Sequence, residues 1–210
     1  MDQFSRKENH KGNTYSNSNL ILEHDTLLLV LDMQEKLIAN ITGSQRLIFN
    51  IKKLIDTCNL LNVHIAITEQ NPLKLGKTLE SIIDSKEYPI FEKMEFSCSQ
   101  NKNFIDYLKK YNFNNIIICG IERHICVLQT SIQLLEKDFN ILIPRDAIGS
   151  RHEIDNNTAF LRLLSSGAVA STTESLICEL CKTSNRKEFR AISKILKDTF
   201  FRVSTPSFDK

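Results

Sequence analysis

Continuous apolar runs alternate along the chain with segments in which apolar residues recur every three or four positions. The run at 26–32 is apolar up to a terminal aspartate, and the run at 115–119 is followed directly by a glycine. Such runs are typical of strands buried on both faces, as in a parallel sheet. Shorter runs at 63–68, 140–144 and 168–172 predict three further strands.

The segments between these runs carry the apolar stripe of amphipathic helices. The clearest stripe begins at Leu47 and repeats at spacings of three, four and seven residues as far as Leu61. The other predicted helices lie at 101–110, 126–135, 150–164, 173–181 and 189–196. Strands separated by helices predict an α/β fold of three α/β/α layers, Rossmann-like, with a parallel sheet of about six strands.

One domain accounts for residues 20–182, because no linker or internal repeat interrupts them. Residues 1–19 are polar and rich in Asn and Ser, which predicts a flexible N-terminal tail. Residues 183–210 are predicted to form a C-terminal helix followed by a Ser/Pro tail. The apolar face of that helix could pack either on its own chain or on a partner.

Composition narrows the possible partners and the cellular location. The 210 residues include 27 basic and 25 acidic side chains, a formal net charge of +2, so no gross charge favours nucleic acid or an anionic membrane. No apolar run approaches the roughly 20 residues of a membrane span, and residues 1–19 lack the apolar core of a secretory signal. The six cysteines lie mostly in apolar periodic segments, which favours a reducing cytoplasm. We therefore expect a small-molecule substrate, with neither nucleic acid nor membrane as partner.

Three residues could carry chemistry, because reactive side chains in such folds collect at the carboxyl ends of the strands. Asp32 ends the first strand, Lys93 lies in a loop-like segment, and Cys126 lies at the start of the helix after the run at 115–119. A helix N-terminus stabilises a thiolate. Each residue also has an ordinary interpretation: a capping Asp, a solvated Lys and a packed Cys. Together they would supply the nucleophile, base and cation of an activated thiol.

Six sequence blocks, in order and in register, resemble the isochorismatase-like cysteine hydrolases. They are Leu29 to Gln34, Thr68 to Pro72, Glu92 to Ser97, Cys119 to Thr130, Asp146 to Arg151, and Ser166 to Ser175. The blocks span about three-quarters of the chain and are closest to the uncharacterised isochorismatase-domain-containing branch of that family.

The resemblance implies a catalytic triad of Asp32, Lys93 and Cys126. It also implies a cis peptide between Ile121 and Glu122, and an oxyanion hole formed by the backbone N–H groups of Glu122 and Cys126. In the implied mechanism the carboxylate accepts the thiol proton, the ammonium favours the thiolate, and the sulfur attacks a carbonyl carbon. The resulting acyl-thioester is hydrolysed by water, so the expected reaction is cleavage of a small-molecule amide or related C–N bond.

Several further residues are candidates for lining the substrate pocket: Gln34, Glu69, Gln70, Phe96, Arg123 and His124. Arg123 either reaches an anionic substrate or faces solvent on the first turn of its helix, and the sequence favours neither. His124 is two residues from Cys126, and two positions along a helix point about 200° apart, so a Cys–His dyad is disfavoured. We interpret it as a pocket-lining or structural residue.

No metal or other cofactor is expected. The chain has no Asp-x-His pair of the kind that metal-binding nicotinamidases carry, and Cys178 and Cys181 more readily pack in their helix than bind zinc. No Gly-x-Gly-x-x-Gly follows the first strand, which disfavours dinucleotide binding. Members of the family are commonly oligomeric, so a homo-oligomer is expected. The alternative to an enzyme is a catalytically idle relative that serves as a ligand-binding or protein-interaction module.

Overall fold

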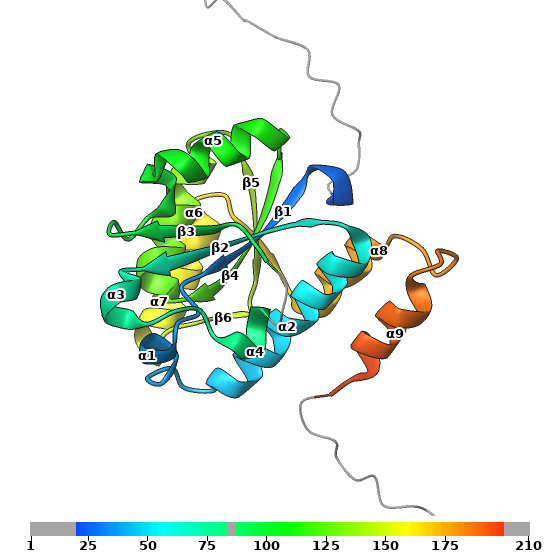
Figure 1. Ribbon diagram of the computed structural model, residues 1–210, viewed down its shortest axis with the longest axis horizontal. Coiled ribbons are helices and arrows are strands. Elements are labelled where there is room, and N and C mark those ends of the chain that lie inside the picture. The colour runs from blue at the N-terminus through cyan, green and yellow to red at the C-terminus, as the bar shows by residue number, and fades with distance from the viewer. Residues whose placement is uncertain (1–19, 84–86, 200–210) are drawn as a thin grey trace, which may run out of the picture.

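The computed structural model describes residues 20–83 and 87–199, so the predicted N-terminal tail and the end of the predicted C-terminal tail lie outside the described residues. A seven-stranded sheet runs through the molecule, with helices on both faces (Figure 1). Every strand pair in it is parallel. The three-layer α/β prediction is confirmed.

The strands follow the order β3-β2-β1-β4-β5-β7, with the short β6 paired to β4. Their bounds are β1 (Thr26–Leu31), β2 (His64–Gln70), β3 (Ile90–Lys93), β4 (Asn115–Ile121), β5 (Asn140–Pro144), β6 (Ile148–Gly149) and β7 (Val169–Ser171). The two longest predicted apolar runs therefore form the central pair, β1 and β4. All six residues of β1 are buried, which explains why its sequence is continuously apolar.

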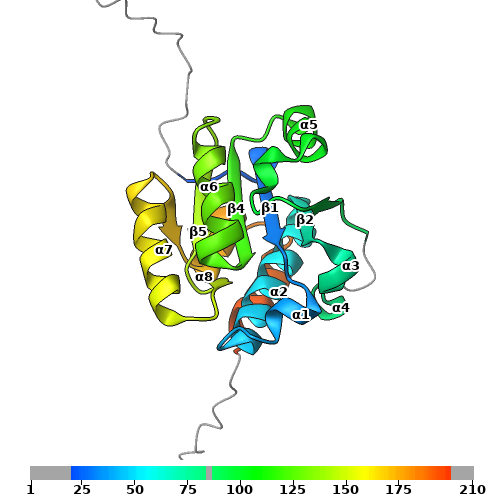
Figure 2. The same cartoon turned by 90° about the vertical axis from the view of Figure 1, so that its left-hand side faces the viewer.

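Helices cover both faces of the sheet, as the view in Figure 2 shows. Helices α2 (Ser44–Leu61), α8 (Thr173–Cys181) and α9 (Phe189–Lys197) contact one another on one face. The other face is covered by α5 (Lys102–Tyr111), α6 (Leu128–Leu135) and α7 (Glu153–Ser165). Short helices fill the loops: α1 (Glu35–Ile38), α3 (Pro72–Leu75) and α4 (Glu80–Ile83), with 3-10 turns at Glu23–Asp25 and Cys98–Gln100. No helix in the described ranges is both long and apolar enough to span a membrane.

The apolar stripe of α9 packs on its own chain. Ile192 is fully buried, and Phe189, Ile195 and Leu196 pack against the same core. The helix contacts α2 and α8. Of the two alternatives that the sequence leaves open for this helix, the described structure shows the intramolecular one.

The register of the central strands sets the position of the site. Leu31 pairs with Gly120 of β4 on one side and with Thr68 of β2 on the other, and Gln70 pairs with Lys93 of β3. The carboxyl ends of β1, β2, β3 and β4 thus lie side by side. Gly120 has a φ of +111°, and a Cβ there would overlap the carbonyl oxygen of Leu31, so only glycine allows this close approach.

Two strands have no counterpart in the sequence prediction. β3 has only four residues and lies at an edge of the sheet, where two of its four positions are exposed and one is buried, so it lacks an apolar run. β6 has only two residues. The segment predicted as a regular helix from Cys126 begins instead with a π-helical turn over Arg123–Val127, which α6 continues.

Candidate active site

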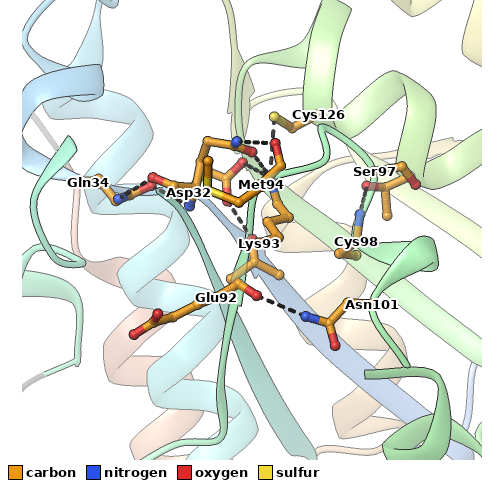
Figure 3. A network of polar contacts seen from close by, with 12 residues as sticks. Asp32, Gln34, Glu92, Lys93, Met94, Ser97, Cys98, Asn101 and Cys126 are labelled. Atoms are coloured by element: carbon orange, nitrogen blue, oxygen red, sulfur yellow. Dashed lines mark hydrogen bonds and ion pairs between the residues drawn. The ribbon is translucent and has the colours of Figure 1, made fainter. Parts of the chain in front are cut away.

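Asp32, Lys93 and Cys126 converge at the carboxyl ends of β1, β3 and β4 (Figure 3). Lys93 Nζ lies 2.6 Å from Asp32 Oδ2 and 3.5 Å from Cys126 Sγ. The side chains of the ion pair have no exposed surface, and Cys126 is 6% exposed. A buried carboxylate and ammonium in contact with a thiol form a complete set for thiol activation.

The Lys93 ammonium has three partners in the fold, as many as it has protons. Besides Asp32 and Cys126, it donates to Gln70 Oε1 at 2.7 Å. Gln70 is itself held at both ends of its side chain, since its Nε2 donates to the carbonyl of Met94 at 2.7 Å. These contacts fix the ammonium beside the sulfur. A lysine that rotated freely would stabilise negative charge on the sulfur less well.

The Asp32 carboxylate is oriented by β2. Thr68 Oγ1 donates to Asp32 Oδ1 at 2.6 Å, and the Asp32 backbone N–H donates to the Thr68 carbonyl at 3.2 Å. Asp32 adopts a left-handed conformation with a φ of 53°, which turns the chain sharply at the strand end. One carboxylate oxygen therefore faces the threonine and the other faces the lysine.

The environment raises the pKa of the Cys126 thiol. Burial is the largest cause, and the nearby Asp32 carboxylate, to which the thiol hydrogen-bonds, acts in the same direction; Lys93 opposes both. The position of Cys126 at the predicted start of a helix favours a thiolate stabilised by the helix N-terminus. The surroundings of the thiol oppose that stabilisation, because burial and the Asp32 carboxylate both raise its pKa.

The predicted pocket residues after β1 and β2 form the frame of this site. Gln34 and Gln70 are paired: Gln34 Nε2 donates to the Gln70 carbonyl at 3.0 Å, and the Gln70 N–H donates to Gln34 Oε1 at 2.8 Å. Glu69 is buried and accepts from the backbone N–H and the hydroxyl of Thr78 at 2.7 and 2.8 Å. Of these three predicted residues, Gln70 contacts the lysine, while Gln34 and Glu69 hold the surrounding loop.

The segment before the nucleophile contains the predicted cis peptide. The peptide bond between Ile121 and Glu122 is cis. The Glu122 carboxylate accepts from the backbone N–H and from Nε of Arg151 at 3.1 and 3.0 Å. Phe96 lies three residues after Lys93 with 53% of its surface exposed.

Arg123 takes neither of the positions considered from the sequence. It is 2% exposed, so it does not face solvent. Its guanidinium donates to the carbonyls of Arg145, Ile148 and Asn156 at 3.0 to 3.1 Å. Two of its three nitrogens, Nη1 and Nη2, thus donate to backbone acceptors.

His124 contacts α7 and the segment before it rather than the triad. Its Nδ1 lies 2.9 Å from Ser150 Oγ, and its Nε2 lies 3.9 Å from Asp155 Oδ2. The structural role considered for it fits these contacts.

Two contributions to the site are not found by reasoning from the sequence: the Thr68 hydroxyl on Asp32 and the Arg151 contact with Glu122. Both residues lie within the sequence blocks quoted above, which is the signal that could have found them. Across residues 20–83 and 87–199, no group of three or more His, Cys, Asp or Glu side chains is placed to hold a metal ion.

Comparison with known proteins matches residues 26–175 to the isochorismatase domain. Isochorismatase family protein 1B of Dictyostelium discoideum is 33% identical over 183 residues, which cover 84% of this chain and 88% of that protein. A solved structure from Caenorhabditis elegans, described as MAR1 ribonuclease, superposes with a TM-score of 0.82 at 32% identity, covering 91% of this chain and 99% of the other.

The Escherichia coli YcaC protein, described as an octameric hydrolase of unknown specificity, superposes with a TM-score of 0.78. Its identity is 19%, over 87% of this chain and 91% of that one, so this likeness bears on the fold alone.

Proposed function

The chain belongs to the isochorismatase family, whose members are generally hydrolases, and on that premise we propose that it cleaves an amide or related C–N bond of a small molecule through Cys126. The observation that carries the proposal is the buried contact of the Lys93 ammonium with both Asp32 and the thiol. Burying two charges beside a thiol costs free energy, because both charges lose their contact with water. A relative without catalytic activity would have no use for that arrangement.

In the proposed reaction Asp32 accepts the thiol proton while the sulfur bonds to the carbonyl carbon. Lys93 lies beside the sulfur and stabilises the negative charge as it develops. The backbone N–H groups of Glu122 and Cys126 are proposed to bind the carbonyl oxygen as it becomes negative. The C–N bond breaks as the proton on Asp32 passes to the leaving nitrogen, and water then hydrolyses the thioester and restores the thiol.

A substrate panel tests the activity. We expect the wild-type chain to hydrolyse at least one member of a set of amides, ureides and isochorismate, and Cys126→Ala to show no turnover above background while remaining folded. A single-stranded RNA belongs in the panel, because one structural relative is described as a ribonuclease. RNA cleavage that survives Cys126→Ala, with no amide hydrolysis, would contradict the proposal.

Alkylation provides a second test that needs no substrate. Iodoacetamide should modify Cys126 faster than the buried Cys58, Cys98 and Cys119, because only Cys126 has a neighbouring carboxylate base in hydrogen-bond contact. Peptide mapping after a short exposure at neutral pH gives the order of reaction. Asp32→Asn should slow the modification of Cys126, and equal rates in the two proteins would contradict the role of Asp32 as base.

We also propose a homo-oligomer located in the cytoplasm. All six cysteines are free thiols, which suits a reducing compartment, and the structurally similar YcaC protein is described as octameric. Light scattering on the purified chain measures the assembly, and a mass equal to one chain would contradict it.

A further inference from the structure

A second cavity lies at the same edge of the sheet as the triad, but over other strands. It has a volume of about 430 Å³ and lies where the loops after β5, β6 and β7 meet the start of α2. Its polar lining includes Thr42, Arg46, Arg145, Ser150, Asn156 and Thr172. The carboxyl ends of parallel strands are where ligands bind in this class of fold, and none of the lining residues belongs to the triad.

The charge around this cavity is largely uncompensated. Arg46 and Arg145 are exposed and form no ion pair within the described residues. The buried Arg123 donates only to backbone carbonyls in the described part of the chain. The carboxylate in the lining is that of Asp146, and its Oδ1 accepts from the backbone N–H and the hydroxyl of Thr173 at 2.8 and 3.0 Å. Two guanidinium groups, those of Arg46 and Arg145, thus line the cavity together with one carboxylate that is already hydrogen-bonded to the start of α8.

Arg145, which lines the cavity, is positioned by an aromatic ring in the absence of a ligand. The guanidinium carbon of Arg145 lies 5.2 Å from the centre of the Phe160 ring, and that of Arg123 lies 5.1 Å from the same ring. Stacking leaves the N–H edges of Arg145 available, since its side chain donates no hydrogen bond within the described part of the chain. Burial and the proximity of Arg145 lower the pKa of Arg123 to about 10, so the two cations repel each other.

The opposite wall also favours negative charge. Gly43, which lines the cavity, precedes α2 and has no side chain to cap its N-terminus, and the first turn of this 18-residue helix contains no acidic residue. The positive end of the helix dipole therefore adds to the two arginines.

We propose that this cavity binds a small organic anion, through a carboxylate or phosphate group held between Arg46 and Arg145. The volume suits a small metabolite rather than a polymer. The site is separate from the triad, but hydrogen bonds connect its wall to the segment that carries the nucleophile. Arg123, three residues before Cys126, donates to the backbone carbonyls of three cavity residues, Arg145, Ile148 and Asn156.

Thermal unfolding and calorimetric titration of the full wild-type chain test the proposal, with inorganic phosphate in one series and succinate in another. Ionic strength is held constant with chloride, so that a general salt effect is subtracted. We expect saturable binding of at least one probe and a matching rise in Tm. Neither probe is an amide, so the result does not depend on whether the proposed hydrolysis occurs.

Matched variants locate the binding. Arg46→Gln/Arg145→Gln should bind the probe roughly tenfold or more weakly. Lys102→Gln/Lys137→Gln removes two exposed charges that line no part of this cavity and should bind like the wild type. Arg46→Gln alone is the safeguard if the double variant is poorly folded.

The outcomes are distinct. Binding of phosphate alone, or of succinate alone, supports the site and identifies the anion class that it takes. Absence of saturable binding for both probes overturns the proposal, as does equal affinity in the arginine and lysine double variants.

Discussion

Two groups of charges at one edge of the sheet differ in how they are compensated. In the triad, Lys93 and Asp32 lie 2.6 Å apart with no exposed surface, and each has further hydrogen-bond partners from β2. Around the second cavity, Arg46, Arg145 and Arg123 have no anionic partner among the described residues. The first group is complete within the chain, whereas the second would become complete on binding an anion. The difference predicts that changes in the first group mainly affect stability and turnover, and that changes in the exposed Arg46 and Arg145 of the second group mainly affect ligand binding.

The largest effect is expected from breaking the buried pair. Lys93→Met leaves the Asp32 carboxylate buried without its cation, which should lower the free energy of unfolding by about 3–5 kcal/mol. Urea denaturation followed by circular dichroism measures it. Asp32→Asn/Lys93→Met removes both charges and should recover most of that loss without recovering hydrolysis. A double variant no more stable than Lys93→Met would show that charge compensation is not the cause.

A smaller loss is expected from the buried arginine of the second group. Arg123→Met deprives three backbone carbonyls of their donor, which should cost about 2–3 kcal/mol. No buried carboxylate is left behind, so the loss should be smaller than for Lys93→Met under the same urea conditions. A loss equal to or larger than that of Lys93→Met would contradict the comparison.

The Thr68 hydroxyl tests how far the partners of Asp32 matter. Thr68→Val keeps the shape but removes a 2.6 Å hydrogen bond to the carboxylate, and it should cost about 1.5–2 kcal/mol. Thr57→Val is the matched control, because Thr57 is equally buried and its hydroxyl has no partner in the described part of the chain. That control should leave the urea midpoint unchanged or raise it. Equal losses in the two variants would mean that the hydrogen bond contributes nothing.

The smallest change in stability is expected for Arg145→Gln. The residue is exposed, and the loss of its contact with Phe160 is offset by relief of its repulsion of Arg123, so the free energy of unfolding should stay within about 0.5 kcal/mol of the wild type. Thermal unfolding without added anion measures this. A loss above about 2 kcal/mol would show that Arg145 belongs to the structural core rather than to a ligand site.

The features that the sequence predicts well are those that depend on continuous burial. The apolar runs of β1 and β4 can be recognised in the sequence because both faces of these strands are covered. They place Asp32 and Cys126 at neighbouring strand ends. Lys93 ends β3, an edge strand with no apolar run, so the sequence offers it as a candidate in a loop-like segment and only the family resemblance assigns it to the triad. The sequence leaves open whether Arg123 reaches an anionic substrate or faces solvent, and the structure shows it buried. Its acceptors are backbone carbonyls from 22 to 33 residues away, which no local pattern reveals.

The second cavity, lined by Arg46 and Arg145, cannot be predicted from the sequence for a similar reason. Its walls come from the segments 41–47, 145–150 and 156, and from Thr172, which only the packing of α2 against the strand ends brings together. No local pattern in these segments indicates that they meet around a common cavity. The partners of the Lys93 ammonium likewise come from three separate strand ends.

The position of β3 has a consequence for how the protein loses function on warming. β3 pairs with a single strand, β2, at an edge of the sheet, while β1 and β4 are flanked on both sides. Edge strands open in partial unfolding events at lower free energy than the centre of a sheet. Amide hydrogens of β3 should therefore exchange with solvent before those of β1 and β4. Each such opening separates Lys93 from Asp32 and Cys126, so heat inactivation should precede global melting.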